Sequence, residues 1–229
     1  MQVAGFLFDK DGTLFDFRAT WDGWAGRMIA ELAAGDAALI ARVAQAVRYD
    51  LQSGGFHADS PFIAGSNDEV AQALAEVLPK YSAPQIEQFL SIRAVEATLS
   101  PAVDLDPFLS GLARRGLSLG VMTNDSEYSA RAQLSEAGVA QHFHFIAGFD
   151  SGYGAKPEPQ PLLAFADHMA LDPQRVVMVG DSLHDLSAGR AAGMQTLGVL
   201  TGTATHAELS PLADAVLPDI GHIPAWLDR

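Results

Sequence analysis

Two aspartates follow the first apolar run of the chain. Asp9 and Asp11 are separated by one residue and come directly after the run at 6–8. Two carboxylates at the end of a buried strand repel each other, and a divalent cation offsets that repulsion. Carboxylate oxygens together with a backbone carbonyl are the ligands that Mg²⁺ prefers. The pair therefore predicts a metal-dependent active site.

Polar side chains that could take part in the same chemistry follow three later apolar runs. They are Thr123 and Asn124 after 117–122, Lys156 in the loop after 143–147, and Asp181 and Asp185 after 175–180. Ligands of an open parallel sheet bind beyond the carboxyl ends of its strands, so we expect these side chains to lie together. Two carboxylate pairs, a hydroxyl group and a lysine are the groups used in phosphoryl transfer through an aspartyl intermediate.

Phosphoryl transfer of this kind needs two carboxyl groups with different roles. An ionised carboxylate attacks phosphorus, and a protonated carboxyl group gives its proton to the leaving alcohol. Mg²⁺ and a lysine neutralise the phosphoryl oxygens, while a hydroxyl group orients them. The second carboxyl group then takes a proton from the water that hydrolyses the acyl phosphate.

Four segments together resemble the motifs of the haloacid dehalogenase (HAD)-like hydrolase superfamily. They read Asp-Lys-Asp-Gly-Thr at 9–13, Val-Met-Thr-Asn at 121–124, Lys-Pro at 156–157 and Gly-Asp-Ser-Leu-His-Asp at 180–185. One segment alone would be a weak signal, but four in this order, each after an expected strand, are specific. The resemblance covers nearly the whole chain and is nearest to phosphoglycolate phosphatases, particularly at 150–157.

The resemblance implies roles for the residues of the first three motifs. Asp9 is implied as the nucleophile and as a Mg²⁺ ligand. Asp11 is implied as the general acid and base, and its backbone carbonyl as a further Mg²⁺ ligand. Thr123 is implied to hold the phosphate and Lys156 to neutralise it.

The remaining candidates have a structural explanation beside the functional one. The resemblance implies Asp181 as a Mg²⁺ ligand and Asp185 as a supporting one. Asp181 could also cap the helix that follows, and Asp185 could have a purely structural role. Asn124 could donate to the phosphate or only shape its loop. Arg18 could bind a second acidic group of the substrate, with Trp21 lining the pocket, or it could be solvated.

Short apolar runs alternate with helical patterns in the first and last parts of the chain. We expect strands at 2–8, 117–122, 143–147, 175–180 and 195–199, and helices at 106–115, 127–137, 159–170 and 183–192. This alternation predicts an α/β, Rossmann-like parallel sheet with helices on both faces. The core domain is expected at 1–16 and 100–229, with an inserted α-helical cap domain at 17–99.

The expected cap shows helical spacing without a strand. Apolar residues recur at every fourth position in 39–47, and the segments 66–69 and 82–85 match capping boxes. Four helices of this kind should pack as a small bundle. The segment 53–57 is expected to be a loop within it.

Single residues separate the reactions known in the superfamily. Dehalogenases need neither a second aspartate nor Mg²⁺, so Asp11 argues against that activity. Phosphonatases use a lysine in the cap, and the cap region here contains only Lys80, beside a proline. A sugar-phosphate mutase stays open, as does a non-catalytic regulatory protein that binds a phosphate ligand. The leading expectation is a Mg²⁺-dependent phosphatase acting on a small phosphate monoester, with phosphoglycolate as the nearest candidate.

The composition bounds the partners of the chain. Its 14 basic and 28 acidic side chains leave a formal net charge of −14, so it lacks the basic surface that nucleic acids or anionic membranes attract. It has no cysteine, which excludes disulfides and thiolate sites. We find no signal peptide and no membrane-spanning run, so we expect a cytoplasmic protein that binds a small phosphorylated metabolite.

Overall fold

The computed structural model describes residues 3–57 and 59–229, which fall into two compact units. The first, called the core unit below, consists of the residues up to Phe17 together with Leu99–Arg229. The second, called the helical unit, is Arg18–Thr98. Within the described part of the chain, no helix combines the length and the apolar character needed to cross a membrane.

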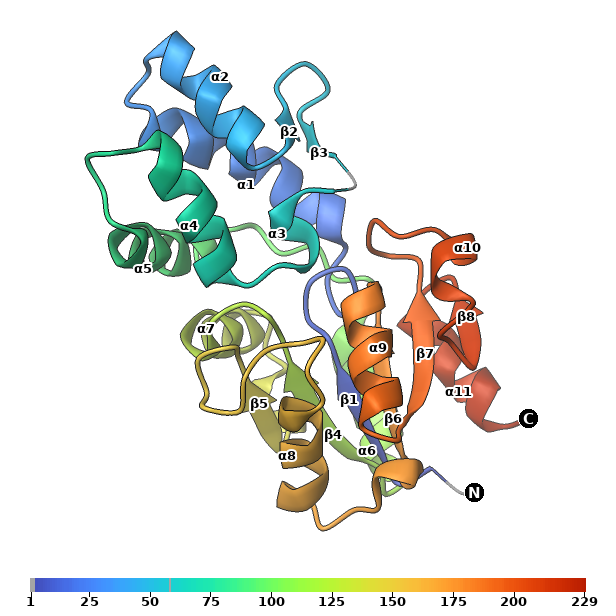
Figure 1. The fold of residues 1–229 in the computed structure, drawn as a ribbon. Helices are drawn as coiled ribbons and strands as arrows, with labels where there is room; N and C mark the ends of the chain where they lie inside the picture. The colour runs from blue at the N-terminus through green and yellow to red at the C-terminus, as the bar shows by residue number, and fades with distance from the viewer. Residues whose placement is uncertain (1–2, 58) are drawn as a thin grey trace. The chain divides into compact units, whose positions relative to one another are not determined.

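The core unit is built on six parallel strands in the order β5-β4-β1-β6-β7-β8 (Figure 1). They are β1 (Gly5–Phe8), β4 (Ser118–Met122), β5 (Phe145–Ala147), β6 (Val176–Gly180), β7 (Gln195–Val199) and β8 (Ala215–Leu217). β1 is central, and its Phe6 is in register with Leu119 of β4 and Val177 of β6. β1 begins at Gly5, whereas the expected start at residue 2 lies outside the described residues. Parallel pairing brings the carboxyl ends of the strands to one edge.

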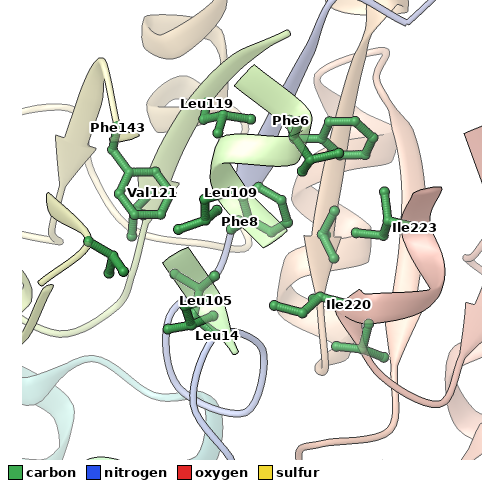
Figure 2. Close-up of a cluster of buried hydrophobic side chains, with 14 of the residues drawn as sticks. Phe6, Phe8, Leu14, Leu105, Leu109, Leu119, Val121, Phe143, Ile220 and Ile223 are labelled. Atoms are coloured by element: carbon green, nitrogen blue, oxygen red, sulfur yellow. The ribbon is translucent and has the colours of Figure 1, made fainter. Parts of the chain in front are cut away.

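Helices cover both faces of this sheet. They are α6 (Leu105–Arg114), α7 (Glu127–Glu136), α8 (Gln160–His168), α9 (Leu183–Ala191), α10 (His206–Leu209) and α11 (Ile223–Leu227), with 3₁₀ turns at Ala140–His142, Pro173–Arg175 and Ile220–His222. Side chains of a strand alternate between faces, so Phe6 and Phe8 of β1 join the buried cluster under α6 and α11 (Figure 2). Leu7 joins a second cluster, with Phe165 of α8. The expected α/β class is thus confirmed.

The C-terminal elements β8, α10 and α11 are not predicted by the sequence analysis. They contain three, four and five residues, which is too short for an apolar period to be recognised. β8 is a strand because it pairs with β7, with Ala215 opposite Leu197. The outer strand β8 is therefore formed by pairing with β7 rather than by the local preference of its own residues.

The helical unit contains more than helices. Its helices are α1 (Phe17–Leu32), α2 (Ala37–Ala46), α3 (Pro61–Ala64), α4 (Asn67–Val77) and α5 (Ala83–Ala94), and the two expected capping boxes form at Ser66 and Ser82. The expectation of a purely helical insert is wrong, because β2 (Tyr49–Asp50) pairs with β3 (Gly55–Phe56). The rings of Tyr49 and Phe56 meet edge to face across this hairpin, with their centroids 5.3 Å apart. The segment 53–57 therefore contains a strand. The interpretation of this unit as a cap stays a prediction.

Candidate active site

Three adjacent strands end in polar side chains at one edge of the sheet. Asp9 follows β1, Thr123 follows β4 and Asp181 follows β6, and β4 and β6 are the two neighbours of β1. The chain turns sharply after Asp9, where Gly12 has a φ of 87°, a conformation that favours glycine. The sheet order therefore gathers residues that are more than 100 positions apart in the sequence.

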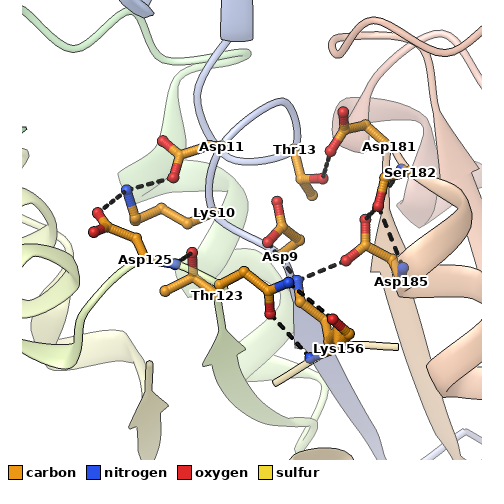
Figure 3. Close-up of polar contacts among 11 residues, drawn as sticks. Asp9, Lys10, Asp11, Thr13, Thr123, Asp125, Lys156, Asp181, Ser182 and Asp185 are labelled. Carbon is orange, nitrogen blue, oxygen red and sulfur yellow. Dashed lines mark hydrogen bonds and ion pairs between the residues drawn. The ribbon is translucent and has the colours of Figure 1, made fainter. Parts of the chain in front are cut away.

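A lysine bridges two of three buried carboxylates at this edge (Figure 3). Nζ of Lys156 lies 2.6 Å from Oδ1 of Asp9 and 2.6 Å from Oδ1 of Asp185. One carboxylate oxygen from each of Asp9, Asp181 and Asp185 lies within 4.8 Å of the other two. We call these three aspartates and Lys156 the carboxylate cluster. One ammonium group among three ionised carboxylates would leave two negative charges without compensation.

Burial dominates the electrostatics of the carboxylate cluster. It raises the pKa of Asp9 from 3.8 to about 7, although the positive charge of Lys156 acts in the opposite direction. The carboxylates of Asp185 and Asp11 add to the rise. Burial, with Asp185 and Asp9, also raises the pKa of Asp181 well above its usual value. For Lys156, burial alone would lower the pKa, but Asp185 and Asp9 outweigh it and keep the ammonium group charged.

The carboxylate cluster fits a divalent cation. Oδ2 of Asp181 is buried and has no hydrogen-bond partner among the described residues. A Cβ atom at Gly12 or at Gly202 would overlap the Asp181 carboxylate, so these glycines keep the space beside it open. A buried carboxylate oxygen without a hydrogen-bond partner, next to another carboxylate, is costly in the absence of a positive charge. Oxygen donors of this kind suit Mg²⁺.

Asp185 is held by groups other than the expected metal. Its Oδ2 accepts hydrogen bonds from the backbone N and the Oγ of Ser182, at 3.0 and 2.6 Å, in the capping box that starts α9. Its Oδ1 accepts from Lys156. The geometry favours a supporting role that orients Lys156. The alternative in which Asp181 caps α9 is wrong, because Ser182 is the N-cap residue.

Thr123 and Asn124 occupy the loop after β4. Thr123 is buried, and its Oγ1 accepts a hydrogen bond from the backbone N of Asp125 at 3.1 Å. The Asn124 side chain bonds the backbone of Lys156 twice, with Nδ2 donating to the carbonyl O and Oδ1 accepting from N, each at 2.9 Å. Of the two roles expected for Asn124, this geometry favours shaping the loop that carries Lys156.

Asp11 pairs with a lysine that the sequence analysis did not single out. Nζ of Lys10 lies 2.6 Å from Oδ2 of Asp11 and 3.3 Å from Oδ2 of Asp125, and it donates to Oε1 of Gln133 on α7. Burial alone would lower the pKa of Lys10, but the carboxylates of Asp11 and Asp125 outweigh it and raise the pKa. Figure 3 shows this group on the other side of Asp9 from Asp181.

Comparison with protein families identifies the family to which the chain belongs. The model of the haloacid dehalogenase-like hydrolase family matches residues 3–193, which is more than half of its length. The chain belongs to the haloacid dehalogenase-like hydrolase family. The resemblance carried by the four motifs is thereby confirmed.

Curated relatives of this HAD hydrolase include proteins named phosphoglycolate phosphatase. The one from Neisseria meningitidis serogroup A is 38% identical over 126 residues, covering 54% of this chain and 53% of the relative. The one from Rhodospirillum rubrum is 36% identical over 119 residues, covering 52% and 49%. The chain therefore spans about half the length of the curated relatives it matches.

Solved structures of HAD proteins share the fold over nearly the whole chain. A HAD family hydrolase from Deinococcus radiodurans R1, with bound phosphate and sodium, has a TM-score of 0.68 at 21% identity and covers 98% of this chain and 95% of that one. A HAD phosphatase from Thermococcus onnurineus has a TM-score of 0.65 at 18% identity and covers 98% of each chain. At these identities the likeness concerns the fold alone.

Arg18 lies outside the core unit of this HAD hydrolase. Nη1 of Arg18 is 3.9 Å from Oδ2 of Asp22, and its side chain is 56% exposed. Its role in binding substrate stays a prediction. Trp21 is buried, with its ring centroid 5.0 Å from that of Trp24, so it packs inside the helical unit.

Several residues at the site were not singled out from the sequence, among them Lys10, Ser182 and Gly202. Lys10 and Ser182 lie inside two of the four motifs, so their positions were a usable signal. Gly202 follows β7, and its own segment shows no chemical pattern. Because β7 lies beside β6, the loop after β7 comes to lie next to Asp181.

Proposed function

We propose that this chain is a Mg²⁺-dependent phosphatase that hydrolyses a small phosphate monoester through an aspartyl phosphate on Asp9. The observation that carries the proposal is the carboxylate cluster, in which Lys156 bridges Asp9 and Asp185 and Asp181 has an oxygen without a partner. This arrangement supports the roles that we propose for Asp9 as nucleophile, for Lys156 as the group that neutralises charge, and for the three aspartates as the cation site.

The proposed metal ligands are Asp9, Asp181 and the backbone carbonyl of Asp11, with Asp185 in support. When bound, Mg²⁺ would supply positive charge that stabilises the phosphoryl oxygens in the transition state. Lys156 supplies a second positive charge from the chain itself, and its two ion pairs hold the ammonium group in place. The same charge opposes the effect of burial on Asp9 and so favours its ionised, nucleophilic form.

The reaction proceeds in two displacements at phosphorus. In the first, a carboxylate oxygen of Asp9 forms a bond to phosphorus while the bond between phosphorus and the alcohol oxygen breaks. Asp11 gives its proton to that alcohol oxygen. In the second, Asp11 takes a proton from water as the water oxygen bonds to phosphorus. The bond from phosphorus to Asp9 breaks, which releases inorganic phosphate and restores both carboxyl groups.

Phosphoglycolate is the first substrate that we propose to test. The support is that curated relatives at 36–38% identity are named phosphoglycolate phosphatase. Fold and core chemistry are shared by enzymes with different substrates, so these names set an order of testing. A screen of phosphorylated metabolites, with phosphoglycolate first, would rank the candidates by kcat/KM.

The activity is tested with 4-nitrophenyl phosphate as a general substrate. We expect Mg²⁺-dependent release of inorganic phosphate by the wild-type chain. Asp9→Asn should reduce turnover at least about 1,000-fold, because the amide is not a nucleophile. The matched control is Asp167→Asn, an exposed aspartate on α8, which should keep wild-type activity. Absence of turnover by the wild type while it still binds Mg²⁺, or an active Asp9→Asn variant, would refute the proposal.

A further inference from the structure

Lys10 is a completely buried lysine between the two aspartates of the first motif. Removing an ammonium group from water costs several kcal/mol unless it is paired and hydrogen-bonded. Most chains place a lysine at the surface, so its position here indicates that its charge serves the groups around it. The two-step reaction above gives Lys10 no role.

The groups around Lys10 come from three segments of the core unit. Asp11 belongs to the turn after β1, Asp125 to the loop after β4, and Gln133 to the second half of α7. The backbone N of Asp125 donates in turn to Oγ1 of Thr123 at 3.1 Å. Lys10 therefore connects the carboxyl group of Asp11 to the loop that carries Thr123.

The two buried lysines of the core unit serve different carboxylates. Lys156 contacts Asp9 and Asp185, whereas Lys10 contacts Asp11 and Asp125. Figure 3 shows Lys10 extending from the chain away from Asp181 and toward Asp11. Since Lys156 already faces the nucleophile, Lys10 is placed to hold the acid.

We propose that Lys10 is a positioning residue that fixes the Asp11 carboxyl group for proton transfer to and from the reacting oxygens, an inference that rests on the proposed function. The 2.6 Å ion pair restrains one oxygen of Asp11, and the contacts with Asp125 and Gln133 anchor Lys10 itself. Loss of Lys10 would remove this restraint from the half-buried Asp11 carboxyl group. Proton transfer requires Asp11 to lie at the right distance and direction from the reacting oxygen. We therefore expect the substitution to impair proton transfer more than substrate binding.

Aryl phosphates with different leaving groups separate this role from a merely structural one. 4-Nitrophenol is much more acidic than phenol, so its departure needs little help from a proton donor, while phenol needs more. The two phosphate esters are otherwise similar in size. A general loss of structure would reduce kcat/KM equally for both, but a misplaced acid affects phenyl phosphate more.

The experiment compares Lys10→Met with the wild type on both esters in saturating Mg²⁺. Because general acid catalysis contributes about 100- to 10,000-fold, we expect the loss in kcat/KM to be at least about tenfold larger for phenyl phosphate than for 4-nitrophenyl phosphate. The rise in Tm on adding Mg²⁺ should match that of the wild type, since the carboxylate cluster is unchanged. Lys80→Met, the same substitution at the exposed lysine of the helical unit, is the matched control and should behave as the wild type.

A second variant separates the proposed role of Lys10 from misfolding of the Lys10→Met variant. Lys10→Met leaves two partly buried carboxylates without the ammonium group that they contact, so Lys10→Met/Asp125→Asn removes one of these carboxylates and should show the same selective loss. Equal losses on the two esters, or no loss, would overturn the role of Lys10 and leave the proposed function intact. Absence of turnover by the wild type would overturn the proposed function and this inference with it.

Discussion

The carboxylates of Asp9, Asp181 and Asp185 lie together, and the ammonium group of Lys156 contacts those of Asp9 and Asp185. Each of these residues is nearly inaccessible to solvent, so water screens little of their repulsion. The arrangement is therefore poorly compensated unless a proton or a metal ion is added. Protons and Mg²⁺ should compete for the same oxygens.

The pKa of Asp9 sets the sign of its effect on stability. In the unfolded chain Asp9 loses its proton near its usual pKa of 3.8, whereas in the folded metal-free protein burial raises the pKa to about 7. At a pH between these two pKa values, Asp9 is protonated in the folded state and ionised in the unfolded chain. The contribution of Asp9 is thus fully present below the unfolded pKa and is lost as the pH rises through the folded pKa.

We expect Mg²⁺ to raise the Tm more at about pH 7.5 than at about pH 5, because the cation must displace protons at the lower pH. Differential scanning fluorimetry with Mg²⁺ or with EDTA at both pH values measures this difference. Asp9→Asn serves as the control, since it removes the titrating group and should reduce the dependence on pH. A Mg²⁺-induced rise in Tm that is the same at both pH values would contradict the expectation.

At the scale of elements, the site depends on loops that follow neighbouring parallel strands. The order β4-β1-β6-β7 places the loops carrying Thr123, Asp9, Asp181 and Gly202 in a row. The loops also fasten one another, since Thr201 Oγ1 donates to the Gly12 carbonyl at 2.7 Å. The loop after β7 therefore shapes the proposed cation site although it contributes no carboxylate to the cluster.

Gly202→Ala tests the contribution of the loop after β7. A Cβ atom at this position would overlap the Asp181 carboxylate, so we expect the loss of most of the Mg²⁺-induced rise in Tm and of most phosphatase activity. Gly111→Ala on α6 is the matched control, because its Cβ would meet only the far end of the Arg114 side chain, at 3.8 Å. That variant should be unchanged or up to about 1 kcal/mol more stable. Normal Mg²⁺ binding by Gly202→Ala would show that the loop is not part of the site.

At the scale of the whole molecule, the helical unit is an insertion with its own interior. Its two connections to the core unit lie side by side, with the backbone N of Asp16 donating to the carbonyl O of Ser100 at 2.8 Å. Buried side chains on separate helices, such as Val43, Leu74 and Leu90, fill its own core. An insertion with its own interior can vary in sequence without disturbing the strand ends, and its part in substrate preference stays a prediction.

Arg18→Ala tests whether the helical unit recognises a second acidic group. If Arg18 bonds the carboxylate of phosphoglycolate, its loss should raise KM for that substrate about 10- to 100-fold, the value of a charge-assisted hydrogen bond. KM for 4-nitrophenyl phosphate, which has no carboxylate, should stay the same. Arg27→Ala, an exposed arginine on the same helix, is the matched control. Equal changes for the two substrates would assign Arg18 a structural role.

The contiguous motifs and the apolar periods of the chain are enough to predict the fold class and the cluster of strand-end residues. Asp9, Lys156, Asp181 and Asp185 could be named because each follows an apolar run long enough to be recognised. The two-residue strands of the helical unit and the three-residue β8 could not, because their conformation comes from pairing partners rather than from their own residues.

What the sequence by itself determined is which side chains gather at the carboxyl ends of the strands, since the parallel direction of the strands follows from the alternation of strands and helices. What only the tertiary structure decided is which of them touch. Lys156 bridges Asp9 and Asp185, Asn124 holds the backbone of Lys156, and Lys10 turns to Asp11. These contacts depend on burial, because a buried charge is costly unless it is paired. Burial is a property of the folded chain alone.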